Sequence, residues 1–327
     1  MIFSMPSNLI MNVERSCGRL VAIRGRQCPQ PHLRPFLEGF YRAASDIGLE
    51  LVSVPENRAF SGIGSVFSRL GLSRTVPGCG RLGLCPVAWA SDRDVFPLQF
   101  RYRLVPWIYD CWGPQLDQWR RLLRRLDPPV VFFSSRDAMR FLSSAIPGSS
   151  CHWVPEAVDA SVYDSGGPLI DRPIAVLEIG RTWLGFSERF GSSLASAGVC
   201  HIRPTVPGSV GIVDLPSALK QARIVVCYPK SITHPELAGG VETVTHRYFE
   251  AMASRCILVG HCPDELRDLW GYNPMVEVGS HTEPELLLRI ALDPAGHQDL
   301  VDRNYRMLQE CGLWKHRIRC MVEHCEY

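Results

Sequence analysis

Two glutamates in the second half of the chain have the spacing of a binding site. Glu242 and Glu250 are eight residues apart in a stretch, 240–254, that we expect to be helical, so they lie about two turns apart on nearly the same face. Gly239 and Gly240 come just before, and glycine permits a tight backbone turn. The first turn of a helix has unpaired N–H groups and the positive end of the helix dipole, which attract phosphate. The pattern therefore predicts an anion site beside two carboxylates.

Two further charged residues follow expected strands. Arg181 comes directly after Gly180 at the end of the strand 174–179, and Asp110 comes after the strand region 100–109. Ligands of open α/β sheets bind outside the carboxyl ends of the strands, and a guanidinium matches phosphate oxygens. Both residues are candidates for a functional site. No set of histidines and carboxylates has the spacing of a metal site, so no bound metal is predicted.

The elements that must position these residues alternate between strand and helix. In the first half, apolar runs at 20–24, 49–54 and 130–133 read as strands, and helical spacing covers 33–47, 116–126 and 136–144. Residues 57–95, rich in Gly, Pro and Ser, give no clear pattern. After a linker at 165–168, strands at 174–179, 199–203, 224–228 and 256–260 alternate with helices. This alternation predicts two parallel-sheet α/β domains with a cleft between them.

Length and composition agree with a folded protein of two domains. The chain has 327 residues, of which 46% are hydrophobic and 21% are charged, which excludes a disordered chain. No run of about 18 apolar residues predicts a membrane span, and no signal-like segment opens the chain. The 13 cysteines are scattered and odd in number, which favours reduced thiols. We therefore expect a cytoplasmic protein.

Charge is unevenly distributed along the chain. Residues 1–150 hold 19 Lys and Arg against 11 Asp and Glu, a balance of +8, and residues 151–327 hold 16 against 22, a balance of −6. The segment 119–126 (WRRLLRRL) fits either a solvated helix face or peripheral contact with an anionic membrane at its inner face. A nucleic-acid partner is not expected.

The second half resembles a known family. The run from Glu242 to Glu250, ETVTHRYFE, continues as AMASRCILVG, and this is similar to the Glu-x7-Glu donor signature of retaining GT-B glycosyltransferases, in particular glycosyltransferase family four (glycosyl transferases group one). Three other segments resemble the same family in the same order: VPEAVD at 154–159 with Tyr163 beyond it, Gly180-Arg181, and WKHR at 314–317.

The resemblance implies a GT-B fold, in which two Rossmann-like parallel-sheet domains face each other across a cleft. It places an acceptor-side domain at 1–155, with helix 313–327 packing back on it, and a donor domain at 156–312. The implied activity is transfer of a hexose-type sugar from a nucleotide-diphosphate sugar with retention of configuration. The resemblance implies neither cofactor nor metal, and the acceptor is a carbohydrate, a lipid-linked or a small molecule.

The resemblance also implies roles for individual residues. Arg181 would stabilise the charge that develops on the diphosphate, and Glu242 would hold sugar hydroxyls. Glu250 would accept hydrogen bonds from the ribose. Asp110 would be the acid on the acceptor side. The phosphate cradle would come from the helix start, with Gly240 and the backbone N–H groups of Thr243, Val244, Thr245 and His246.

The chain departs from the family at several positions. The lysine expected shortly after Arg181 is missing, and Arg189 is a candidate replacement. The strand that often ends in His-Asp ends here in Tyr109-Asp110, and the glycine expected after Glu242 is Thr243. Two other functions therefore stay open: a non-catalytic GT-B subunit that binds a sugar nucleotide or a partner protein, and a GT-B epimerase of nucleotide sugars.

Overall fold

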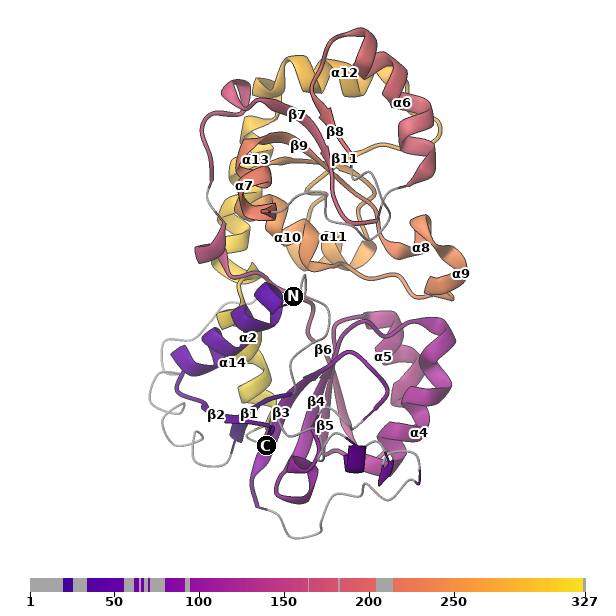
Figure 1. Ribbon diagram of the computed structural model, residues 1–327, viewed down its shortest axis with the longest axis vertical. Coiled ribbons are helices and arrows are strands. Elements are labelled where there is room, and N and C mark those ends of the chain that lie inside the picture. Colours follow the sequence, from indigo (N-terminus) through magenta and orange to yellow (C-terminus); the bar gives the residue numbers. More distant parts are fainter. Residues whose placement is uncertain are drawn as a thin grey trace. The chain divides into compact units, whose positions relative to one another are not determined.

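The computed structural model describes residues 20–25, 34–55, 62–64, 66–67, 70, 80–91, 95–163, 165–181, 183–203 and 214–325. The chain divides into two compact units. The first comprises residues 1–154 together with 314–327, and the second comprises 155–313. Each unit is built around a parallel sheet covered by helices (Figure 1), so the predicted α/β class with two parallel-sheet domains is confirmed.

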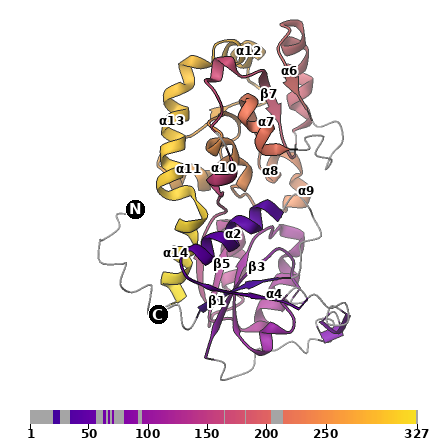
Figure 2. The same cartoon turned by 60° about the vertical axis from the view of Figure 1, so that its left-hand side comes forward.

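The first unit has a six-stranded sheet in the order β2-β1-β3-β4-β5-β6, with every neighbouring pair parallel. Helices α2 and α14 cover one face of this sheet, and α4 and α5 cover the other (Figures 1 and 2). The elements are β1 (Leu20–Arg24), α2 (Arg34–Asp46), β2 (Glu50–Ser53), β3 (Leu82–Val87), β4 (Arg103–Ile108), α4 (Leu116–Leu126), β5 (Val130–Phe133), α5 (Arg136–Ser143), β6 (Ser150–Trp153) and α14 (Trp314–Cys325).

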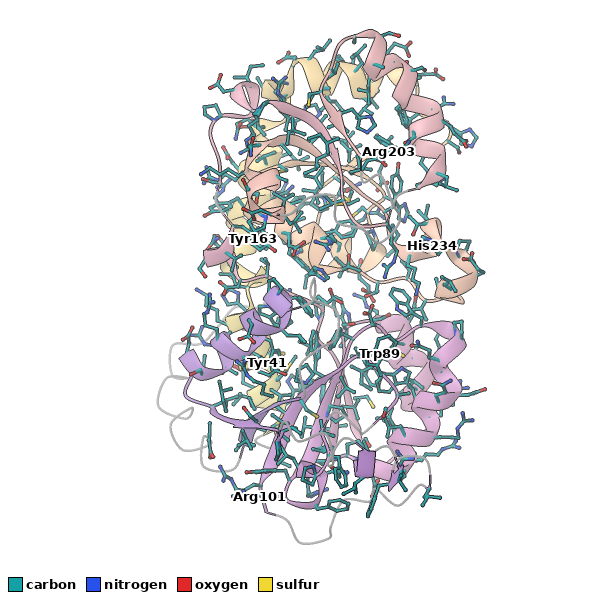
Figure 3. The ribbon with its side chains drawn as sticks, viewed as in Figure 1. Tyr41, Trp89, Arg101, Tyr163, Arg203 and His234 are labelled. Atoms are coloured by element: carbon teal, nitrogen blue, oxygen red, sulfur yellow. The ribbon has the colours of Figure 1, made fainter. Side chains whose placement is uncertain are left out.

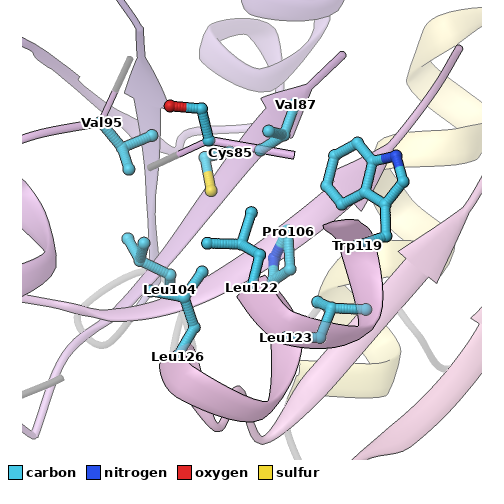
Figure 4. A pocket seen from close by; sticks show the side chains of 10 residues that line it. Cys85, Val87, Val95, Leu104, Pro106, Trp119, Leu122, Leu123 and Leu126 are labelled. Carbon is cyan, nitrogen blue, oxygen red and sulfur yellow. The ribbon is translucent and has the colours of Figure 1, made fainter. Parts of the chain in front are cut away.

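Helix α4 shows how the sequence pattern becomes packing. Its apolar residues recur at helical spacing, and its arginines lie on the other side. Asp117 lies in the first turn, and Asp127 ends the helix in the left-handed conformation with φ 45°. The buried side packs against β3 and β4, as Figure 4 shows for Trp119, Leu122, Leu123 and Leu126 with Cys85, Val87, Leu104 and Pro106.

Helix α14 belongs to the first unit although it ends the chain. The Trp314 ring lies 5.1 Å from that of Phe36, 5.4 Å from Phe40 and 5.1 Å from Trp107, measured between centroids. These contacts join α14 to α2 and β4. Burial of aromatic rings in such a cluster contributes strongly to packing.

Strand β3 was not among the expected strands, although it lies between β1 and β4. Gly83 and Pro86 interrupt its pattern, and both residue types are unusual in a central strand. A Cβ atom at Gly83 would lie 2.4 Å from Cδ1 of Ile23, so the glycine allows close packing there.

The second unit has a five-stranded parallel sheet in the order β11-β10-β9-β7-β8. Helices α6 and α12 pack on one face, and α7, α10 and α11 pack on the other. The elements are β7 (Ile174–Glu178), α6 (Leu184–Ser196), β8 (His201–Ile202), α7 (Leu215–Gln221), β9 (Ala222–Cys227), α8 (Lys230–Thr233), α9 (Pro235–Ala238), α10 (His246–Ala253), β10 (Ile257–Gly260), α11 (Asp264–Trp270), β11 (Val276–Glu277), α12 (Pro284–Leu292) and α13 (Gln298–Met307). Among the described residues, no helix is long and apolar enough to cross a membrane.

Candidate functional site

The candidate site lies at the carboxyl ends of β7, β9 and β10 in the second unit. These strands are parallel neighbours, so the segments that follow them meet at one edge of the sheet. We call this edge, formed by 179–181, 228–245 and 261–263 with the start of α10, the carboxyl edge. Two pairs of its charged residues contact each other, His261 with Glu242 and Arg247 with Glu250.

Glu250 is buried at the carboxyl edge, with 6% of its surface exposed. The Tyr163 hydroxyl donates to Oε1 at 2.5 Å, and Arg247 Nη1 donates to Oε2 at 2.8 Å. Burial and the Glu250 carboxylate raise the pKa of Tyr163, so its hydroxyl stays protonated and remains a donor. Tyr163 is labelled in Figure 3. Glu250 is therefore an acceptor whose orientation is fixed from two sides.

Glu242 is half-buried and more accessible than Glu250. Ser231 Oγ donates to Glu242 Oε2 at 2.8 Å, and His261 Nε2 lies 3.6 Å from the same oxygen. His261 lowers the pKa of the Glu242 carboxyl, and Glu242 in turn raises the pKa of His261. On its other side, His261 Nδ1 lies 3.7 Å from Glu277 Oε2. Glu242 and His261 thus each favour the charged form of the other.

The expected helix start at Gly240 is wrong, because α10 begins only at His246. Gly239 and Gly240 form a left-handed turn with φ 57° and 81°, and Thr245 is extended. Most residues of the intervening segment are β-branched, which disfavours a helix. The Glu265 carboxylate, which accepts a hydrogen bond from Val244 N–H, also holds this segment in place.

Two of the N–H groups expected to bind phosphate have protein partners. Val244 N–H donates to Glu265 Oε2 at 3.0 Å, and His246 N–H donates to Glu156 Oε2 at 2.7 Å. Both carboxylates are buried, and His246 Nδ1 also lies 2.8 Å from Glu156 Oε2. Thr243 Oγ1 contacts Glu265 Oε2 at 3.0 Å. The cradle of Thr243, Val244, Thr245 and His246 is therefore corrected: three of these residues precede the helix, and two of the N–H groups already bind carboxylates.

The two candidate arginines differ in their surroundings. Arg181 is exposed and follows Gly180, which has φ 70°, directly after β7. Arg189 lies on α6, where Nε donates to the main-chain oxygen of Thr282 and Nη2 lies 3.6 Å from Glu283 Oε1. Arg189 therefore joins α6 to the segment before α12.

Asp110 belongs to the first unit and follows β4. It adopts the left-handed conformation with φ 55°, which aspartate tolerates better than most residues. Trp112 Nε1 donates to Asp110 Oδ1 at 3.3 Å. Its role as an acceptor-side acid stays a prediction.

The sequence analysis missed several residues of the carboxyl edge. Glu156 lies 90 positions from its partner His246, and Glu265 lies 21 positions from Val244. No spacing rule connects such pairs. Arg247 lies inside the Glu-x7-Glu run, three residues before Glu250, and this helical spacing could have indicated their ion pair. Nothing in the pattern indicates that its guanidinium approaches the turn after β7.

The chain matches no protein-family model and no curated protein sequence. Among solved structures, sucrose-phosphate synthase from Thermosynechococcus elongatus matches with a TM-score of 0.57 at 14% identity, over 94% of this chain and 98% of that chain. HepE from Anabaena, in complex with UDP-glucose, matches with a TM-score of 0.55 at 10% identity, over 94% and 99%. AviGT4, a glycosyltransferase involved in avilamycin A biosynthesis, matches with a TM-score of 0.53 at 12% identity, over 93% and 96%.

These matches define the class of fold. Two parallel-sheet α/β domains of this kind are those of GT-B glycosyltransferases, and the likeness extends over nearly the whole chain. At these identities the likeness shows the fold alone, so activity has to be argued from the site.

Proposed function

We propose that the protein is a retaining glycosyltransferase of the family-four type, which transfers a hexose-type sugar from a nucleotide-diphosphate sugar to an acceptor. The observation that carries this proposal is the placement of Arg181 after β7, and of Glu242 and Glu250 after β9, on neighbouring parallel strands of the fold described above. The match to a HepE structure that holds UDP-glucose supports a donor of this class.

The chemistry assigns each residue a task. When the glycosidic bond to the diphosphate breaks, negative charge grows on the leaving group, and Arg181 stabilises it. Glu242 accepts hydrogen bonds from the sugar hydroxyls. Glu250 accepts from the ribose, since a carboxylate has more acceptor positions than its two protein partners use. Asp110, from the first unit, serves the acceptor, which we expect to be a carbohydrate, a lipid-linked or a small molecule.

A thermal-shift screen tests the proposal most directly. A ligand that binds only the folded protein raises the melting temperature by mass action. We expect one nucleoside diphosphate and its sugar conjugates to raise it, with EDTA making no difference. Proton NMR of the anomeric signal in a subsequent transfer assay then reports retention. The absence of any shift across UDP, GDP, ADP and dTDP and their sugars would contradict the proposal.

One observation favours a second candidate, a non-catalytic GT-B subunit. Glu156 and Glu265 occupy two N–H groups at the start of α10 that a phosphate would otherwise use. Such a subunit would bind a sugar nucleotide yet neither hydrolyse nor transfer it. Consumption of the donor without an acceptor would instead indicate the epimerase.

We also propose peripheral contact of the first unit with an anionic membrane through α4 and α5. Arg121 and Phe141 are exposed there, the latter at 41%. Arg124 Nε, in contrast, donates to the main-chain oxygen of Ala145 at 3.3 Å and so also supports the packing of the two helices. Sedimentation with vesicles that contain about 30% phosphatidylserine tests this contact. We expect each arginine near the membrane surface to contribute about 1 kcal/mol to the binding free energy.

A further inference from the structure

Arg247 is a rigidly held cation at the carboxyl edge. It is the second residue of α10, and its Nη1 donates to Glu250 Oε2 at 2.8 Å. Glu250 is itself fixed by Tyr163 at 2.5 Å, so the carboxylate that orients the guanidinium cannot turn freely. The Arg247 side chain is still 21% exposed. A charged group that is oriented in advance and remains accessible is suited to bind a ligand of opposite charge.

The guanidinium lies against the turn that follows β7. A Cβ atom placed on Gly180 would be 3.6 Å from Arg247 Nε, which is van der Waals contact. Arg181 is the next residue after Gly180. Two arginines from separate segments therefore approach the same end of β7, where open α/β sheets bind their ligands.

The donors of Arg247 are not used up by the protein. Among the described residues, Glu250 is its hydrogen-bond partner, through Nη1, and none of its nitrogens is buried without a partner. The guanidinium therefore keeps N–H donors that face accessible space. The other groups expected to bind phosphate have partners of their own: Val244 N–H and His246 N–H bind carboxylates, and Arg189 binds a main-chain oxygen.

We propose that Arg247 binds the diphosphate of the donor together with Arg181. This assignment rests on the proposed function and deepens it. A nucleoside diphosphate carries two or more negative charges, and two guanidinium groups from different segments neutralise them better than Arg181 alone. It also gives Glu250 a second task, because the carboxylate orients Arg247 as well as accepting from the ribose.

Isothermal titration calorimetry of UDP, GDP, ADP and dTDP against the full chain, with the matching nucleosides, tests the assignment. For the diphosphate that binds the wild type, Arg247→Ala should weaken affinity by about 10- to 100-fold, the range for hydrogen bonds to a charged group. Affinity for the nucleoside should stay within about twofold, since it has no phosphate. A merely structural role would lower both affinities together.

Arg289→Ala is the matched control, because it removes one exposed arginine of the same unit, on α12, that belongs to no predicted site. We expect it to bind the diphosphate like the wild type. Arg247→Lys keeps the charge opposite Glu250 and is the test variant to use if Arg247→Ala does not fold. It should lose about 3- to 10-fold, since an ammonium lacks the planar fork of the guanidinium.

The outcomes separate the two hypotheses. The role of Arg247 would be overturned if both variants bound the diphosphate as tightly as the wild type, or if diphosphate and nucleoside affinity fell equally. Either result would leave the proposed function standing. Failure of the wild type to bind any of the diphosphates would overturn both.

Discussion

The two ends of the sheet in the second unit use arginine in opposite ways. At the amino ends of the strands, Arg172 is buried, with 3% of its surface exposed. Its guanidinium donates to the main-chain oxygens of Gly167 at 3.0 Å, Ala222 at 2.8 Å and Ser254 at 3.0 Å, and also to that of Ser165. These oxygens belong to segments that lead into different strands or turns. Arg172 therefore holds these segments together.

At the carboxyl edge, Arg181 is exposed and Arg247 is partly accessible, and Arg247 pairs with the Glu250 carboxylate. The difference between Arg172 and Arg247 lies in how completely the surrounding polar groups satisfy each guanidinium. A cation whose donors are bound to main-chain oxygens stabilises the fold, whereas one that keeps donors toward solvent is available to a ligand. By this comparison Arg172 is a structural arginine, and Arg247 is the one that keeps accessible donors.

The largest expected effect lies at the amino end. Arg172→Met keeps much of the side-chain volume but removes the guanidinium donor from four main-chain oxygens, so we expect the free energy of unfolding to fall by about 3–5 kcal/mol. Urea unfolding followed by circular dichroism measures it. Arg223→Met is the control, since Arg223 is partly buried and donates to the main-chain oxygens of Arg172 and Ala291, and it should cost about half as much. A wild-type unfolding curve for Arg172→Met would refute the structural role.

The second effect is on turnover at the carboxyl edge. Arg181→Ala should reduce kcat by about 10²–10³, the loss found on removing one donor that stabilises developing charge, with little change in the free energy of unfolding. Lysine at this position should restore part of the rate, because it supplies charge without the bidentate fork. Steady-state kinetics with the donor found in the thermal-shift screen measures both variants. Normal turnover of a folded Arg181→Ala protein would remove Arg181 from the mechanism.

The third effect distinguishes the two glutamates of the carboxyl edge. Glu250→Ala should weaken binding of the free nucleoside diphosphate and of the sugar nucleotide alike, by about 1.5–3 kcal/mol. Glu242→Gln should lower turnover and leave diphosphate affinity nearly intact, because its proposed contact is with the sugar.

Calorimetry on both glutamate variants, beside Tyr163→Phe as a control that keeps the Glu250 carboxylate, tests this distinction. Equal losses of diphosphate affinity in Glu242→Gln and Glu250→Ala would show that the roles are wrongly assigned.

The smallest effect is a pH dependence of stability. Glu242 raises the pKa of His261, so the imidazolium stabilises the folded protein at pH values below the unfolded pKa of about 6.5, and this stabilisation is lost as pH rises through the raised folded value. The stabilisation from the Glu242 carboxylate, whose pKa is lowered, is fully present above its unfolded value of about 4.5 and is lost as pH falls through the lowered folded value. The pair therefore contributes most between these limits.

Because the pair is half-exposed, we expect His261→Gln to cost about 0.2–1 kcal/mol at pH 5.5 and less at pH 8.5. Urea unfolding at the two pH values measures the difference. A cost that grows toward pH 8.5 would contradict the ion pair.

Much of the fold was predictable from the sequence because the signals are local. Helix α4 follows from apolar residues at helical spacing, and β5 and β9 follow from short β-branched runs. Strand β3 was missed, because Gly83 and Pro86 interrupt its β-strand sequence pattern. Its pairing with the neighbouring strands β1 and β4 is what defines it as a strand. The late start of α10 was missed for a similar reason: Glu265 holds Val244 from a distant segment.

The sequence by itself determined part of the carboxyl edge. Arg181 could be placed there because the residues that follow parallel strands are brought to one side of the sheet, and Glu242 and Glu250 because of their spacing and the family resemblance. Only the tertiary structure decided which charges are satisfied and which stay available. Glu156 reaches His246 across 90 positions, and Arg247 meets the turn at Gly180 from another helix. Such pairs depend on side-chain packing between segments that no spacing relates, so the use of each charge is a property of the folded molecule.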